Sequence, residues 1–252
     1  MLRKFGFFAM TLIGTHACFG ETFRGLPEGF VYLRSIDPTI LQDMRYATAA
    51  NFTGAIVPGY KAGECVLLRE VAEALREVQK DLRTQNVSLK VYDCYRPIRA
   101  VKSFVAWAQG AGGEDPSHYP RERRDQLIKH GYIGAVSSHS TGTAVDLTIV
   151  PLPSSEAKPE VDKTYPHGSC ISTKEEREPD NSVDMGTGID CFDKKSYTLS
   201  PEITSAQSAM RQDLVCAMSK RGFQNYYREW WHFSFPAADT TGKAYDFIIT
   251  EP

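Results

Sequence analysis

Hydrophobic residues recur every three or four positions in three stretches of the chain, which is the spacing of one face of an α-helix. The pattern predicts helices over residues 66–82, 98–109 and 202–221, and Gly222 is well placed to end the last of them. In the first stretch the repeating positions are Leu68, Val71, Leu75, Val78 and Leu82. Charged residues lie between them, so we expect this helix to bury one face.

Three other stretches, residues 87–95, 143–150 and 229–235, have the composition and alternation of β-strands. The first should stop before Pro97 and the third before Pro236, because proline has no N–H to donate to a sheet. The two faces of the second strand are Val145, Leu147 and Ile149 on one side and Ala144, Asp146 and Thr148 on the other.

The remaining segments read as loops. Residues 110–123 are rich in glycine, proline and charge, and residues 151–183 show no period, which indicates a long surface insertion. Short aromatic strands with segregated helices favour an α+β fold. We expect a single domain with a central, mainly antiparallel sheet flanked by helices.

The N-terminus has the order of a secretory signal peptide. Arg3 and Lys4 precede an apolar run of roughly ten residues, and small residues follow up to Gly20. We expect residues 1–20 to be removed and residues 21–252 to form an exported, periplasmic domain. The run is shorter than the roughly 20 residues that span a bilayer, so no membrane insertion is expected after cleavage. A buried N-terminal element is the alternative, and lipid attachment at Cys18 is disfavoured because no leucine lies upstream in Thr15-His-Ala.

The formal net charge is −2 with Lys and Arg scattered, which argues against a nucleic-acid partner. The cysteines after residue 20 are Cys65, Cys94, Cys170, Cys191 and Cys216. Their number is odd, so at least one thiol is unpaired. Cys170 and Cys191 bracket a polar stretch and form the expected disulfide, whereas Cys216 is expected to be a small buried residue of a helix. No pair has zinc-finger spacing.

Chemistry-bearing residues gather first in Ser137-Ser-His-Ser-Thr-Gly-Thr-Ala-Val-Asp146. His139 lies in a turn, and Asp146 lies on the following strand, opposite its aliphatic face. Gly142 lets the chain fold back, so both side chains can reach one point as zinc ligands. The alternative is a hydrogen-bonded loop histidine beside a paired aspartate, and this cluster alone leaves the two open.

A second cluster is Glu229-Trp-Trp-His232. His232 would complete the three protein ligands of a catalytic zinc, and Glu229 would be the general base. Residues three apart point to opposite faces of a regular strand, so Glu229 must precede the strand or a bulge must re-aim it. Alternatively, the aromatic residues are core and Glu229 forms an ion pair.

Arg96 follows a buried strand in Asp93-Cys-Tyr-Arg-Pro97, at a sheet edge where sites gather. Its guanidinium can stabilise the oxyanion that forms when water attacks a carbonyl. A structural pair with Asp93 is the alternative.

Together these motifs resemble the zinc D-alanyl-D-alanine dipeptidases of the VanX type. The likeness rests on the three motifs Ser-x-His-x6-Asp, Glu-Trp-Trp-His and Asp-x-Tyr-Arg-Pro. It extends over roughly residues 35–236 through Arg45-Tyr-Ala-Thr48, Asn51-Phe-Thr-Gly54, His118-Tyr-Pro120, Gly131-Tyr132 and Asp184-Met-Gly-Thr187. The first motif is shared with D,D-carboxypeptidases, peptidoglycan endopeptidases and the hedgehog signalling domain.

The resemblance implies one zinc ion held by His139, Asp146 and His232, with Glu229 as base and Arg96 steadying the transition state. It implies hydrolysis of the small dipeptide D-Ala-D-Ala. The further residues it implies are Asp184 and Tyr46 for the substrate's ammonium group and Ser138 for its carboxylate.

The chain departs from these relatives at Thr141, where many have arginine, and at Cys94, where alanine is common. Two other functions stay open: a zinc D,D-carboxypeptidase acting on peptidoglycan stem peptides, and a non-catalytic module that uses the zinc fold as a scaffold.

Overall fold

The computed structural model describes residues 25–154, 167–238 and 241–252. The strands are β1 (Phe30–Tyr32), β2 (Leu41–Gln42), β3 (Val66–Leu68), β4 (Val87–Asp93), β5 (Ala144–Pro151), β6 (Gln224–Asn225) and β7 (His232–Ser234). The α-helices are α1 (Leu33–Ile36), α2 (Arg69–Arg83), α3 (Ile98–Gln109) and α4 (Ser205–Ser219). The larger sheet has the order β2-β4-β5-β7-β6, and β1 pairs with β3 separately. The expected α+β fold is confirmed.

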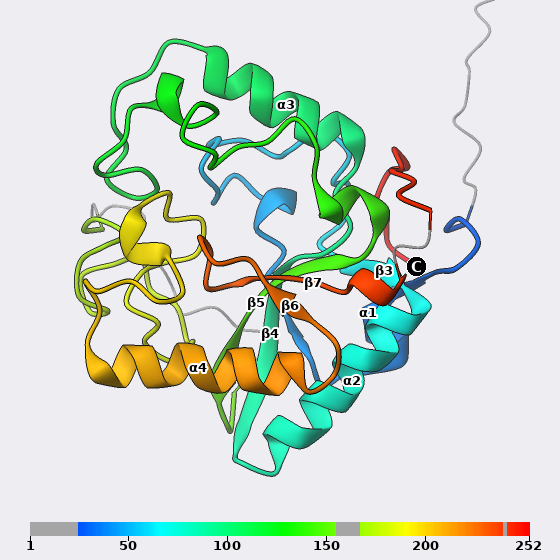
Figure 1. Cartoon of the computed structure of the whole chain (residues 1–252). Coiled ribbons are helices and arrows are strands. Elements are labelled where there is room, and N and C mark those ends of the chain that lie inside the picture. Colours follow the sequence, from blue (N-terminus) through cyan, green and yellow to red (C-terminus); the bar gives the residue numbers. More distant parts are fainter. Residues whose placement is uncertain (1–24, 155–166, 239–240) are drawn as a thin grey trace, which may run out of the picture.

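Helices cover both sides of the larger sheet (Figure 1). α2 and α4 pack on one face, where their apolar side chains join those of β4 and β5 in one core. α3 lies across the other face, where its residues join a second, aromatic core. The sheet is antiparallel except where β2 joins β4. The expected mainly antiparallel arrangement is therefore confirmed.

The alternation predicted for β5 is confirmed in space. Val145, Leu147 and Ile149 belong to the core beneath α2 and α4. Asp146 is buried on the opposite face and pairs in register with His232 of β7. Because a strand alternates its side chains, one strand serves a core on one face and a polar site on the other.

The first predicted helix begins later than expected. Residues 66–68 form β3, which pairs with β1, and α2 starts only at Arg69. Leu68 fits both a helix repeat and a buried strand, so periodicity alone did not separate the two. α3 spans Ile98–Gln109 as expected, and α4 spans Ser205–Ser219, inside the predicted 202–221.

Gly222 closes the end of α4 with a φ of +90°. The amide of Gly222 donates to Ser219 O, and the amide of Phe223 donates to Met218 O. This left-handed ending is favoured at glycine because a side chain there is strained. The chain then turns back toward β6 and β7.

The predicted insertion, residues 151–183, begins at the last residue of β5, Pro151, and its residues 167–183 form no helix or strand but are fixed to the sheet by charge. Lys90 Nζ of β4 lies 2.5 Å from Asp180 Oδ1, and Tyr92 OH donates to Asp180 Oδ2 at 2.5 Å. Arg45 Nη1 pairs with Glu178 Oε1 at 2.8 Å. Residues 155–166 of the insertion lie outside the described residues, as does the predicted signal peptide.

Two disulfides link described residues, Cys170–Cys191 as expected and Cys65–Cys94, which the sequence did not predict. Cys216 is free and exposed on α4, so the expectation that it is buried was wrong. Its position falls on the outer side of the helix, away from Leu214 and Met218. Within the described ranges, every helix is too short or too polar to cross a membrane.

Candidate metal centre and active site

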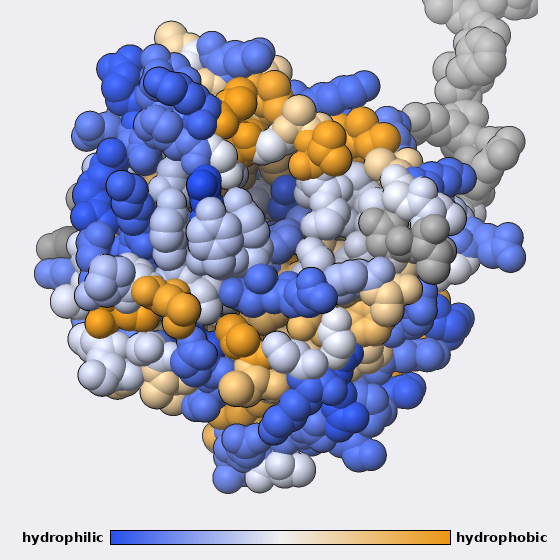
Figure 2. Space-filling model, viewed as in Figure 1, coloured by the Kyte–Doolittle hydropathy of each residue, from blue (hydrophilic) through white to orange (hydrophobic). Residues whose placement is uncertain are grey.

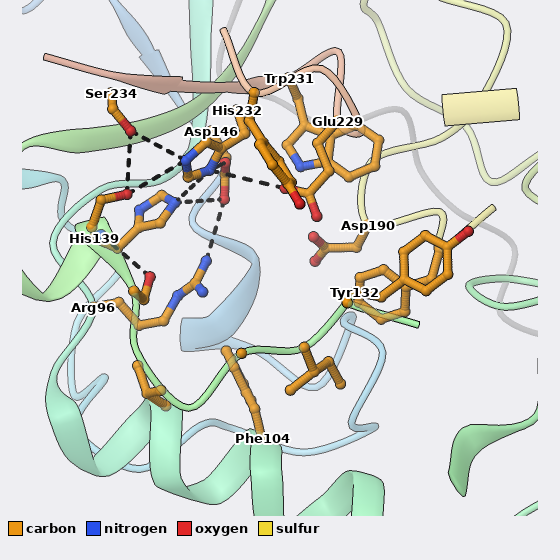
Figure 3. A pocket seen from close by; sticks show the side chains of 18 of the residues that line it. Arg96, Phe104, Tyr132, His139, Asp146, Asp190, Glu229, Trp231, His232 and Ser234 are labelled. Carbon is orange, nitrogen blue, oxygen red and sulfur yellow. Dashed lines mark hydrogen bonds and ion pairs between the residues drawn. The ribbon is translucent and has the colours of Figure 1, made fainter. Parts of the chain in front are cut away.

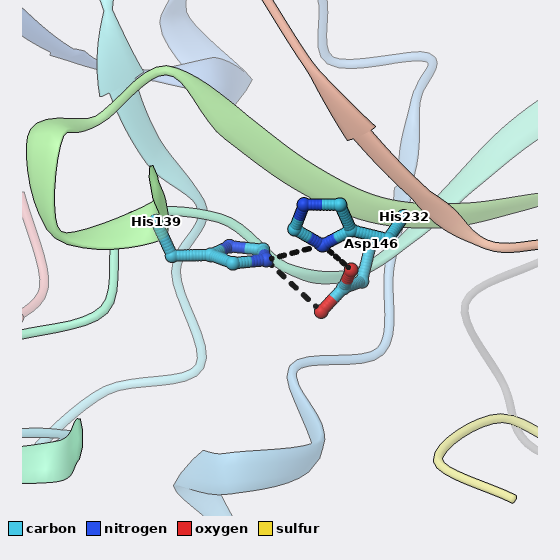
Figure 4. A group of neighbouring side chains, drawn as sticks. All are labelled: His139, Asp146 and His232. Atoms are coloured by element: carbon cyan, nitrogen blue, oxygen red, sulfur yellow. Dashed lines mark hydrogen bonds and ion pairs between the residues drawn. The ribbon is translucent and has the colours of Figure 1, made fainter. Parts of the chain in front are cut away.

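Three side chains from three separate elements converge on one point (Figure 4). His139 Nε2 lies 3.1 Å from His232 Nδ1 and 3.3 Å from Asp146 Oδ2, and His232 Nδ1 lies 3.0 Å from Asp146 Oδ1. The pairing of β5 with β7 brings Asp146 opposite His232. His139 comes from the 3-10 turn Ser138–Thr141, which Gly142 ends with a φ of +79°.

The donor set fits a zinc ion. Zinc ligands at 2.0–2.2 Å in a tetrahedral arrangement lie about 3.3–3.6 Å from one another, close to the separations found here. His139 Nδ1 donates to Cys94 O at 2.6 Å, which leaves the lone pair of Nε2 directed at the centre. Among the described residues, these three form the one cluster of His, Cys, Asp or Glu side chains that is close enough together to hold a metal ion.

The charges of the three residues support one another. Burial by itself raises the pKa of Asp146, but His139 and His232 outweigh it and hold that pKa well below its usual range. Burial lowers the pKa of His232, but the hydrogen bond to Asp146 and the negative charges of Asp146 and Glu229 together outweigh burial and raise this pKa. Asp146 is therefore a carboxylate, the form in which it binds a metal.

Glu229 reaches the same centre because it precedes β7. Its amide donates to Tyr226 O at 3.0 Å, and the amide of His232 donates to Glu229 O at 3.2 Å. This turn brings Glu229 Oε2 to 4.0 Å from His232 Nδ1 although the residues are three apart. Burial, followed by the negative charges of Asp146 and Asp190, raises the pKa of Glu229 to about 7. A carboxylate with that pKa can accept a proton near neutral pH.

Arg96 lies beneath the metal centre and points toward it (Figure 3). Its Nε donates to Asp93 Oδ2 at 2.8 Å and its Nη2 to Asp146 Oδ2 at 3.3 Å. The guanidinium carbon lies 5.2 Å from the ring centre of Tyr46 and 5.3 Å from that of Phe104. The expected structural pair of Arg96 with Asp93 is confirmed, and Arg96 also lines the cavity, where its role toward an oxyanion stays a prediction.

All of these groups open into one cavity of about 470 Å³. The cavity lies between α3, which contributes Val101 and Phe104, and β7, which contributes His232 and Ser234. The molecular surface is hollowed at this place (Figure 2). Apolar groups on one wall and polar groups on the other are typical of a site for a small polar molecule.

Of the residues expected at the ends of a substrate, two line this cavity and one does not. Ser138 and Tyr46 line it. Asp184 lies elsewhere, where its carboxylate accepts from Arg177 Nη2 at 2.8 Å and from Gln207 Nε2 at 2.7 Å. Thr141 also lies outside the cavity lining, with its hydroxyl donating to Ser138 O at 2.8 Å.

Asp190 occupies the cavity wall instead of Asp184. It is 7% exposed, and Tyr46 OH donates to its Oδ2 at 3.0 Å. Within the described residues it forms no salt bridge. Burial, followed by the charge of Asp146, raises the pKa of Asp190 to about 6. Asp184 and Asp190 both follow the long insertion, and no local pattern distinguishes them, although Asp190 directly precedes a cysteine that was expected to be bridged.

The chain is similar to known dipeptidases over most of its length. A family model described as D-ala-D-ala dipeptidase matches residues 27–155 and 151–250. A D-alanyl-D-alanine dipeptidase of Enterococcus faecalis is 33% identical, covering 85% of this chain and 96% of its own. Those of Enterococcus faecium and Escherichia coli are 32% and 28% identical, covering 88% and 82% of this chain and 98% and 85% of their own.

Proposed function

We propose a function from one premise: the chain belongs to the D-ala-D-ala dipeptidase family of metallopeptidases. The proposed activity is hydrolysis of free D-Ala-D-Ala with one zinc ion. The observation that carries the proposal is the cavity itself. It holds the His139, Asp146 and His232 cluster, the buried Glu229 and, on another wall, a buried carboxylate without an ion-pair partner among the described residues.

Zinc, when bound, supplies a Lewis acid that polarises the peptide carbonyl and makes a neighbouring water acidic. Glu229 accepts the proton of the attacking water, which its pKa of about 7 permits, and passes it to the leaving amine. Arg96 stays charged, because Asp93 and its other neighbours outweigh burial and hold its pKa well above the usual range. Its guanidinium offers hydrogen bonds to the oxyanion.

The two ends of a free dipeptide find opposite partners. A buried carboxylate without a cation is costly, so Asp190, oriented by Tyr46, is suited to the substrate's ammonium group. We assign this role to Asp190 in place of Asp184. Ser138, whose Oγ lies 3.5 Å from His232 Nε2, is at the metal end and is suited to the substrate's carboxylate.

The deciding experiment compares D-Ala-D-Ala with a stem pentapeptide ending in the same dipeptide, using purified, zinc-loaded protein. The proposal predicts rapid cleavage of the dipeptide and little of the pentapeptide, because a longer chain leaves Asp190 without an ammonium partner. Preferential cleavage of the pentapeptide would instead identify a D,D-carboxypeptidase. Cleavage of neither would leave a non-catalytic zinc scaffold. Export to the periplasm is part of the proposal and is tested by N-terminal sequencing of the mature protein, which should begin near residue 21.

A further inference from the structure

A disulfide lies behind each end of the candidate site. Cys65–Cys94 joins the residue before β3 to the residue after β4, and Cys170–Cys191 joins the insertion to the residue after Asp190. All four half-cystines are buried. The two bridges therefore differ in which part of the site they adjoin.

Cys94 is the direct backbone partner of a candidate metal ligand. Its carbonyl accepts the hydrogen bond from His139 Nδ1 at 2.6 Å. Two residues later, the amide of Arg96 donates to His139 O at 3.2 Å. A carbonyl that holds one ring nitrogen of a ligating histidine sets both the tautomer and the direction of the other nitrogen. The position of Cys94 thus decides where His139 Nε2 points.

Cys94 follows the irregular end of its strand. The pairing of β4 with β5 shifts between Val91 and Asp93, opposite Asp146. The β4–β5 ladder therefore ends here, and the peptide that carries the Cys94 carbonyl is held to β3 by Tyr95 N, which donates to Val66 O at 2.9 Å. The covalent link from Cys94 to Cys65 supplies a restraint at this place.

The other half of the bridge is well anchored. Cys65 O accepts from Leu33 N at 2.9 Å, and Cys65 N donates to Gln42 Oε1 at 2.8 Å. The adjoining β3 pairs with β1, and its Leu68 N donates to Gly142 O at 3.1 Å, in the turn between two candidate ligands. Through Cys65, the carbonyl of Cys94 is tied to the same strand that supports that turn.

The second bridge serves the opposite end of the cavity. Cys191 lies between Asp190 and Phe192, both of which line the cavity. Gly188 N donates to Cys170 O at 3.0 Å, so the bridge and this hydrogen bond together hold the segment that carries Asp190. Neither cysteine contacts a candidate metal ligand through the hydrogen bonds of the described residues.

We propose that the Cys65–Cys94 disulfide is a positioning element for the metal ligand His139, so that its removal weakens zinc binding selectively. The inference rests on the proposed function, because it takes His139 as a zinc ligand. The Cys170–Cys191 bridge is the matched control. The two bridges close 29 and 21 residues, so the unfolded chain gains similar freedom when either is lost.

The experiment compares C65A/C94A with C170A/C191A, both in a Cys216→Ser background that removes the exposed thiol. The measurements are the zinc dissociation constant by competition with a chromophoric chelator, the melting temperature, and kcat and KM for D-Ala-D-Ala at saturating zinc. We expect C65A/C94A to bind zinc about tenfold or more weakly, in the range found when the partner of a ligand is lost. We expect C170A/C191A to keep its zinc affinity and to show a raised KM, with a similar fall in melting temperature.

Equal zinc affinities in the two variants, or losses that simply follow the melting temperatures, would overturn the inference. If C65A/C94A does not fold, the single variants Cys65→Ala and Cys94→Ala test the same point with less lost volume. If C65A/C94A and both single variants fail to fold with zinc present while C170A/C191A folds, the Cys65–Cys94 bridge is needed for folding itself. That result would also overturn the positioning role. A parent protein that binds no zinc or leaves the dipeptide intact would refute the proposed function instead.

Discussion

Replacing Asp190 with asparagine should make the zinc-free protein more stable and the enzyme much worse. Asn keeps nearly the same shape and can still accept the hydrogen bond from Tyr46 OH. It removes a carboxylate that is 7% exposed and has no salt bridge among the described residues. Buried charges of this kind are costly to the fold and are retained where a ligand uses them.

The size of the stability change follows from the pKa. In the fold the Asp190 pKa is raised from 3.8 to about 6, chiefly by burial and then by Asp146. At 1.36 kcal/mol per pH unit this difference is about 3 kcal/mol. A raised carboxyl pKa means that the folded state binds the proton more tightly, so stability is lost as pH rises from 3.8 to about 6. Asp190→Asn does not titrate, and above pH 7 it should be about 3 kcal/mol more stable than the parent.

The assay is urea unfolding of metal-free protein at several pH values, with steady-state kinetics of the zinc-loaded enzyme. An ammonium group left without its buried partner costs about 3–5 kcal/mol, so kcat/KM for D-Ala-D-Ala should fall on the order of 10²–10⁴-fold. Asp184→Asn is the control. Burial acts to raise the Asp184 pKa, but hydrogen bonds from Gln207, Gly186 and Arg177 outweigh it and lower that pKa, so this carboxylate stabilises the fold above its unfolded pKa. Asp184→Asn should therefore destabilise the protein at neutral pH and leave kcat/KM unchanged.

The reasoning about Asp190 would be refuted if Asp190→Asn were less stable than the parent at every pH. It would also be refuted if Asp184→Asn, and not Asp190→Asn, impaired hydrolysis. The first result would mean that the carboxylate contributes to folding; the second would return the ammonium site to Asp184.

Three further outcomes are expected. Glu229→Gln should lower kcat by about 10²–10⁴-fold while zinc content, measured by atomic absorption, stays the same, since general-base catalysis has that range and Gln leaves the metal ligands in place; unchanged hydrolysis would remove Glu229 from the mechanism. Asp180→Asn should destabilise the fold by about 3 kcal/mol in urea unfolding and speed tryptic cleavage within residues 167–183, because it leaves buried Lys90 without its carboxylate; unaltered cleavage would mean that other contacts fix the insertion. Cys216→Ser should change the free energy of unfolding by less than about 0.5 kcal/mol, as expected at an exposed position, and a larger loss would show that the thiol is packed.

The parts of the fold that could be predicted are those whose patterns are local. α3 repeats its apolar residues at helical spacing. β5 alternates so clearly that the alternation predicted the face of the strand on which Asp146 lies, opposite the aliphatic residues. β3 could not be separated from α2, because Val66, Leu67 and Leu68 suit both, and only the distant β1 makes a strand of them. The Cys65–Cys94 bridge was missed for the same reason: it depends on where β3 and β4 end in space.

The same distinction between local patterns and contacts with distant segments applies to the candidate site. The grouping of His139, Asp146 and His232 could be predicted because side chains able to bind a metal are chemically distinctive and lie in short motifs. Strand periodicity placed Glu229 and His232 on opposite faces, but Glu229 lies in a turn that leads into β7 and so reaches the same centre. Periodicity does not report such a turn. Asp190 could not be told from Asp184, since the difference lies in which of the two faces the cavity after the insertion folds back.

Metal removal and return test the central claim most directly. The protein is stripped of metal with a chelator, its zinc content is measured, and cleavage of D-Ala-D-Ala is followed as zinc is added back. The account predicts no cleavage without metal and full recovery at one zinc ion per chain, with His139→Ala failing to recover. Full activity in the metal-free protein, or recovery of His139→Ala at one zinc ion per chain, would contradict it.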